Sequence, residues 1–148
     1  MSITIEDVDF DIINEKWSYF KLKDGTLLRG RVIIRKIVRK GFHPIGYPNY
    51  DIDYTIVYSA RVPKEFLREP SSKAPKIIKE NVEAEFNYPD DIEILKDNVQ
   101  EYETDDGFIV KVKFVPMKVL KLKQSNRYGE PIYVIYSQIL INLIKKGT

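Results

Sequence analysis

The sequence predicts an all-β or nearly all-β fold, in which a small barrel module occurs twice and both copies pack as one pseudo-twofold unit. Three observations predict it. The chain has 148 residues, the length of one ordinary domain. Most apolar residues alternate with polar ones at the period of a strand. The chain also aligns with itself. We expect a first β-repeat at 1–62, a linker with a short helix at 63–81, and a second β-repeat at 82–148.

The self-alignment needs a shift of 82 positions and one inserted residue over about 50 residues. It places Asp24-Gly25 on Asp106-Gly107, and Gly46-Tyr47-Pro48-Asn49-Tyr50 on Gly129-Glu130-Pro131-Ile132-Tyr133. Such an ordered series indicates an internal duplication. The alternative is that β-proteins reuse the same turn residues, so that similar turns recur without a common origin.

The first copy predicts strands separated by turn signals. Residues 17–22 alternate and contain three aromatic side chains, and Asp24-Gly25 then marks a hairpin turn. Residues 27–39 are rich in β-branched side chains and predict one bent strand or two strands. A loop with two glycines and two prolines follows at 41–48, and a strand returns at 50–57. We expect Trp17, the only tryptophan, to be substantially buried.

The second copy repeats this order, preceded by a strand at 82–86 whose counterpart is Ile3 and Ile5. Pro116 falls inside a strand, so it should lie at an edge, a bulge or a corner. The final segment, 138–146, fits a buried strand or a short helix, and the repeat favours the strand. In the linker, Pro63 begins a predicted helical turn.

Four or five strands in about 60 residues match the size of a small barrel of the SH3 or Sm kind. The stretch Leu22 to Val32 resembles the first hairpin of Sm-like RNA-binding proteins. The chain then continues Ile33-Ile34-Arg35-Lys36 and lacks the Asp and Asn that contact RNA in that family. The resemblance therefore implies the hairpin geometry alone and transfers no binding residue.

Composition excludes several classes of chemistry. Without cysteine there are no disulfides, thiolate nucleophiles or cysteine-zinc sites, and a single histidine excludes a multi-histidine metal centre. The net charge is +2 and no apolar run approaches the roughly 20 residues that span a bilayer. We expect a cytoplasmic protein with no membrane association, no cofactor and no metal site. The abundance of Lys, Ile and Tyr is typical of thermophile proteins.

Two basic stretches are the best candidates for a binding site. Residues 29–40 and 111–127 contain no acid. Residues 5–62 hold 10 basic and 8 acidic side chains, and residues 87–144 hold 7 and 9, so the first copy is the better candidate. Strand alternation predicts one basic face with nearby tyrosines that stack on bases. The predicted nucleic-acid site consists of Arg29, Arg31, Arg35, Arg39, Tyr47 and Tyr50.

The competing interpretation pairs these basic strands with the acidic segments that precede them in each copy. Since the sequence shows no nucleophile with a base, we expect a protein that is not an enzyme. The favoured function is a non-catalytic protein-interaction or assembly subunit with a protein partner. The alternative is a nucleic-acid-binding protein that uses the basic strand of the first repeat.

Overall fold

The computed structural model describes residues 4–147, and nearly all of them lie in strands or in turns between strands. The two helical segments are single 3-10 turns, η1 and η2. In chain order the elements are β1 (Ile5–Val8), β2 (Phe10–Asn14), β3 (Ser18–Leu22), β4 (Leu27–Phe42), β5 (Pro48–Arg61), η1 (Lys64–Phe66), η2 (Lys79–Asn81), β6 (Val82–Asn87), β7 (Ile92–Lys96), β8 (Gln100–Thr104), β9 (Phe108–Ser125) and β10 (Pro131–Lys145).

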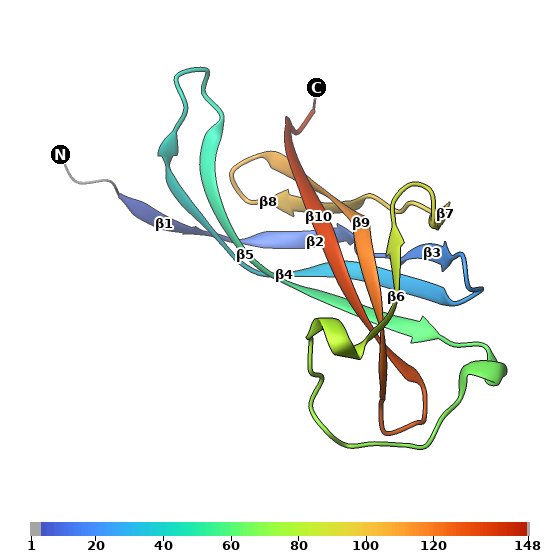
Figure 1. Cartoon of the computed structure of the whole chain (residues 1–148). Coiled ribbons are helices and arrows are strands. Elements are labelled where there is room, and N and C mark those ends of the chain that lie inside the picture. The colour runs from blue at the N-terminus through green and yellow to red at the C-terminus, as the bar shows by residue number, and fades with distance from the viewer. Residues whose placement is uncertain (1–3, 148) are drawn as a thin grey trace.

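The strands form two antiparallel sheets that exchange one strand (Figure 1). Sheet A contains β1, β3, β4 and β5 of the first predicted repeat together with β7 of the second. Sheet B contains β6, β8, β9 and β10 of the second predicted repeat together with β2 of the first. Each half of the chain therefore completes its sheet with a strand from the other half.

Most ladders of the two sheets share the same strand pairing. Ser18 pairs with Gly30 in sheet A, and Gln100 pairs with Val112 in sheet B, with both numbers raised by 82. The β4–β5 and β9–β10 ladders also correspond. Here 82 is added to the residue number in the first strand and 83 to the residue number in the second, because the loop of the second half is one residue longer. The exchanged strands also have equivalent registers, because β2 pairs with β8 through the same residue positions as β7 pairs with β3. Both turn glycines, Gly25 and Gly107, have a φ of 93°.

The all-β prediction is confirmed, but the predicted small barrels do not close, because both sheets are open. Among the described strands, β5 pairs only with β4 and β10 pairs only with β9, so a long edge strand borders each sheet. The physical reason is the exchange. The opposite edges of β4 and β9 are occupied by short strands, and the sheet extends into a strand of the other half instead of curling back on itself.

The core lies where the inner faces of the two sheets meet. It contains Phe20, Val32, Tyr102, Val110 and Phe114, each at most 2% exposed. At Gly30 the sheets approach so closely that an added Cβ would lie 2.6 Å from the Phe114 ring. The glycine therefore makes room for the phenylalanine.

Both long strands carry a bulge at the same place. The β4–β5 register shifts between Ile34 and Lys36, and the β9–β10 register shifts beside Pro116. The prediction that Pro116 lies at such a break is confirmed, since proline donates no ladder hydrogen bond. The bulge also reverses the alternation, because both Ile34 and Ile37 are buried while Arg35 and Lys36 between them are exposed.

Several local predictions are confirmed and one is wrong. The segment from Gln138 to Lys145 is strand, and η1 follows Pro63. Ile5 lies in β1, whereas Ile3 lies outside the described residues. Trp17 is only half-buried and does not belong to the core, because it precedes β3 on the outer side of sheet A. Within residues 4–147, no helix has the length and apolar character needed to cross a membrane.

Candidate functional site

The structure does not bring the six predicted nucleic-acid residues together on one surface. Arg29, Arg31 and Arg35 project from the outer face of sheet A. The bulge in β4 turns Arg39 toward the other face, so the expectation that strand alternation aligns all four arginines is wrong. Tyr47 lies against the Phe108 ring, with centroids 5.5 Å apart.

Arg39 and Tyr50 are engaged between the two halves of the chain. The guanidinium of Arg39 donates to Asp106 over 3.0 Å and also pairs with Glu6. The Tyr50 hydroxyl donates to the same Asp106 carboxylate and lies 3.1 Å from the Thr104 hydroxyl. Burial disfavours the charged carboxylate, but the hydrogen bonds from Thr104, Tyr50 and Arg39 hold the pKa of Asp106 below its ordinary value. These two residues are therefore part of an internal contact.

An equivalent contact occurs on the other side of the molecule. Lys121, Tyr133 and Asp24 occupy the positions of Arg39, Tyr50 and Asp106. Lys121 lies 3.3 Å from Asp24, and the Tyr133 hydroxyl donates to Asp24 over 3.0 Å. Each Asp-Gly turn thus holds a basic residue and a tyrosine of the opposite half. Both contacts are structural, since the Lys121 side chain is 8% exposed.

Most basic side chains on the outer faces are paired with acids. Arg35 lies 2.8 Å from Asp53, and Lys113 lies 2.9 Å from Asp97. Further pairs are Lys36–Asp7, Lys40–Asp51, Lys111–Glu101 and Lys118–Glu85. Exposed pairs of this kind stabilise little, but they neutralise the surface. Among the described residues, the basic strand of the second copy therefore presents no cluster of unpaired charge.

Arg29 and Arg31 differ from the other cations of β4. Both guanidinium groups lie over the Trp17 ring, at 4.4 and 4.5 Å from its centroid. Arg29 donates to the Ser59 hydroxyl and Arg31 to the Glu15 carbonyl, and neither forms an ion pair with a described residue. The Arg31 Nε atom is buried without a hydrogen-bond partner among the described residues.

Strand pairing places further unpaired cations beside these two arginines. Across four strands, one row of side chains on the outer face is Lys96, Tyr19, Arg29 and Ser59, and the next is Glu93, Lys21, Leu27 and Arg61. We name as the basic face the cations Lys21, Arg29, Arg31, Arg61 and Lys96 with the aromatic residues Trp17 and Tyr19. Lys96 reaches this face only because β7 is exchanged between the sheets, which no local sequence signal indicates.

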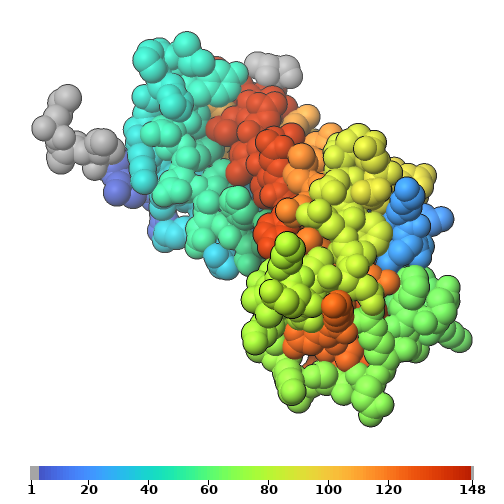
Figure 2. All heavy atoms as spheres, in the orientation of Figure 1, coloured from blue at the N-terminus to red at the C-terminus, as the bar shows by residue number. Residues whose placement is uncertain are grey.

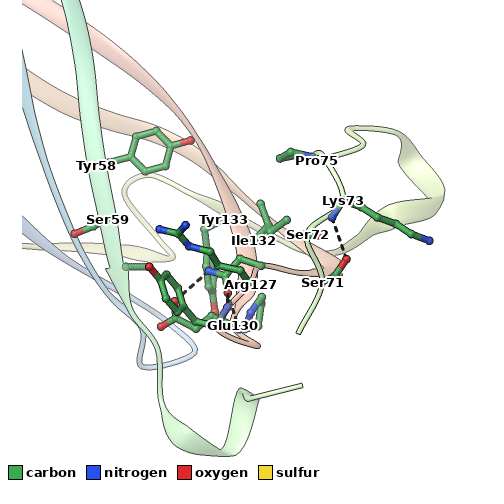
Figure 3. Close-up of a pocket in the computed structure, with 14 residues that line it drawn as sticks. Tyr58, Ser59, Ser71, Ser72, Lys73, Pro75, Arg127, Glu130, Ile132 and Tyr133 are labelled. Carbon is green, nitrogen blue, oxygen red and sulfur yellow. Dashed lines mark hydrogen bonds between the residues drawn. The ribbon is translucent and has the colours of Figure 1, made fainter. Parts of the chain in front are cut away.

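A separate cleft of about 820 Å³ lies where the linker meets the β9–β10 turn (Figure 3). Asn126 organises this turn, since its side-chain oxygen accepts from the backbone of Tyr128 and Glu130, and its carbonyl accepts from Ser71. Arg127 lies over the neighbouring Tyr128 ring. The cleft has an open mouth, and the turn itself uses the polar atoms of Asn126.

The described residues contain no group of three or more His, Asp or Glu placed to hold a metal ion. Comparisons with protein-family models, curated proteins and solved structures find no match for the chain.

Proposed function

We propose that this protein is a non-catalytic assembly subunit that pairs with a second copy of itself through the edge of β10. The observation that carries the proposal is the outer edge of this strand. β10 is 15 residues long and hydrogen-bonds to β9 on one side only. Between Ile132 and Ile144, no described group outside β9 donates to or accepts from its backbone.

From Ile132 to Ile144, β10 carries no charge and no proline. Lys145 at its end is its only charged residue, whereas β5, the equivalent edge of sheet A, carries Asp51, Asp53 and Arg61. Edge strands are normally protected by charges, prolines or a covering element. An uncharged edge with free N–H and C=O groups is a template for another strand.

Two neighbouring apolar side chains in the C-terminal half of β10 are exposed, one on each face. Leu140 and Ile141 point to opposite faces, yet they are 44% and 37% exposed. Atoms of this strand are visible at the surface in Figure 2, in red. A strand packed into a complete sheet would bury one of these two side chains.

A second copy of β10 is the partner that fits this edge best. Antiparallel pairing about a twofold axis would oppose uncharged residues from Gln138 to Ile144, without like charges facing each other. Pairing with β5 of another copy would place this apolar edge against Asp51 and Asp53, and would lead to open-ended polymers.

We also propose that the two halves descend from one duplicated β-module. Support comes from strand registers that repeat in the long-strand ladders and in the ladders of the exchanged strands, the bulges included. Common turn chemistry accounts for similar hairpins, but not for two bulges in equivalent positions. Arg39 and Lys121, at equivalent positions, also make equivalent contacts with the opposite Asp-Gly turn.

Sedimentation velocity tests the self-pairing. The wild-type protein should sediment as a dimer of the 17.4-kDa chain. Ile141→Lys should give a monomer, because it places a charge on the paired edge of each copy. Tyr58→Lys is the matched control, since Tyr58 is the equivalent residue of β5 and is similarly exposed at 42%.

The control variant should remain a dimer. A wild-type monomer at high micromolar concentration would contradict the proposal. So would polymers that dissolve in Tyr58→Lys and persist in Ile141→Lys, because that result assigns the contact to β5.

A further inference from the structure

We propose that the basic face of sheet A binds single-stranded nucleic acid, with phosphates on its cations and a base stacked on Tyr19. This site differs from the one the sequence predicts, because it excludes Arg35, Arg39, Tyr47 and Tyr50. It also lies away from β10, so it is independent of the proposed self-pairing.

The first argument is uncompensated charge. The five cations of the basic face form no ion pair with a described residue, and one acid, Glu93, lies in the same rows. Glu15, whose carbonyl accepts from Arg31, is a second neighbouring acid. Five positive and two negative charges therefore give a balance of +3, in a molecule whose net charge is +2. Elsewhere on the same strand the cations are matched with acids, as for Arg35 with Asp53.

The second argument is a control within the molecule. The equivalent positions of sheet B carry Glu101 and Glu103 in place of Tyr19 and Lys21, and Ile144 in place of Arg61. Lys111 and Lys113 stand in place of Arg29 and Arg31, and both are paired with acids. The unpaired cations and the exposed Tyr19 are thus a property of one half and not of the fold that both halves share.

The third argument is geometry. Trp17 holds two guanidinium groups at its ring, which limits the rotamer entropy they lose on binding. Apart from Arg29 Nε and Arg31 Nη1, no guanidinium N–H of the pair has a partner among the described residues. Guanidinium forks match phosphate oxygens, and the 39% exposed ring of Tyr19 offers a stacking surface in the same row.

The open outer face of a β-sheet favours single-stranded nucleic acid over a duplex. Residues of one row lie on neighbouring strands, about 4.8 Å apart. Flexible nucleotides can place a phosphate and an unstacked base on such neighbours, whereas the bases of a duplex are not free to stack on side chains.

Trp17 provides a direct readout, because it is the only tryptophan of the chain. We would titrate the protein with oligo-dT and oligo-U and record tryptophan fluorescence and probe anisotropy. Quenching should accompany binding. The affinity should fall with salt at about 0.7 logarithmic units per unit of log salt for each phosphate contacted. The Ile141→Lys variant, titrated in parallel, keeps assembly from being mistaken for binding.

The variants separate this face from the rest of the surface. Arg29→Ala with Arg31→Ala should weaken binding at least tenfold. Arg61→Ala with Lys96→Ala should also weaken it, and these two side chains have no partner among the described residues whose loss could disturb the fold. Lys111→Ala with Lys113→Ala is the matched control and should leave the affinity within twofold. Far-ultraviolet circular dichroism checks the fold of each variant.

Three results would overturn the proposal. They are no quenching at low salt, an equal loss of affinity in the Lys111/Lys113 variant, and binding of a duplex or of poly-glutamate as tight as that of the single strand. The last result would assign the face to polyanions in general or to an acidic protein.

Discussion

At the scale of single residues, Gln100 joins the two sheets. Its side chain extends from β8 in sheet B to the backbone of Val32 in sheet A, accepting from the N–H over 2.8 Å and donating to the carbonyl over 2.6 Å. The pairings of β1 and β3 stop on either side of this part of β4. The glutamine amide therefore forms the two hydrogen bonds with Val32 that the backbone of a neighbouring strand would form.

We expect Gln100→Leu to lower the free energy of unfolding by about 2–4 kcal/mol, because two buried backbone groups lose their partners. Tyr102→Phe removes a hydroxyl that accepts from the same amide and donates to the Val32 carbonyl over 3.3 Å, and should cost about 1 kcal/mol because the Gln100 amide still satisfies that carbonyl. Urea unfolding of both variants measures the difference. Equal costs would show that the amide contributes nothing to joining the sheets.

The contacts of the Asp-Gly turns predict a second contrast. Asp24→Asn leaves the buried Lys121 with Glu83 alone, at 3.6 Å, and should destabilise the fold by about 2–3 kcal/mol. Asp53→Asn breaks a solvent-exposed pair and should leave the denaturation midpoint unchanged. A similar midpoint for both variants would mean that the turn contacts do not hold the halves together.

Tyrosine ionisation gives the pH dependence. Burial raises the pKa of Tyr102 to about 12, and burial also raises the pKa of Tyr50 and of Tyr133. The folded state holds these protons more tightly than the unfolded state does. The contribution of these tyrosines to the free energy of unfolding is therefore fully present below the unfolded pKa of about 10, and it is lost as the pH rises above that value. The absorbance of tyrosinate should show that these residues lose their protons above the unfolded pKa, at the same pH at which the protein unfolds. Tyr102→Phe should remove one late step, and titration of all tyrosines near pH 10 in the folded protein would contradict the assignment.

At the scale of elements, the close approach of β4 and β9 depends on a glycine that faces a large side chain. Gly30 faces Phe114, while the equivalent positions, Val112 and Val32, carry two side chains of intermediate size. Gly30→Ala should cost about 1–3 kcal/mol, because the new methyl group overlaps the phenylalanine ring. In the double variant with Phe114→Val the two costs should be less than additive, as thermal and urea unfolding would show. Additive costs would mean that the two residues do not compete for the same space.

Local sequence signals predicted the elements better than their arrangement. Turn glycines, alternating strands and the break at Pro116 follow from backbone chemistry within a few residues. The exchange of β2 and β7 does not, because Phe10–Asn14 and Ile92–Lys96 contain nothing that distinguishes pairing within a half from pairing across halves. The bulge in β4 has no glycine or proline to mark it, so the inward turn of Arg39 could not be predicted.

At the scale of the whole molecule, the two sheets share strand pairings in the described residues but differ in their surfaces. Sheet A combines a charged edge, β5, with the unpaired cations of the basic face. Sheet B combines an uncharged edge, β10, with an ion-paired face. The shared fold thus carries one surface for each proposed contact.

Hydrogen exchange along β10, recorded as a function of protein concentration, tests the proposed self-pairing most directly. The backbone amides of Gln138–Ile144 that point away from β9 should be protected at high concentration and should exchange rapidly on dilution. Those of the equivalent part of β5 should exchange rapidly throughout. Rapid exchange of the outward amides of both strands at every concentration would contradict the account.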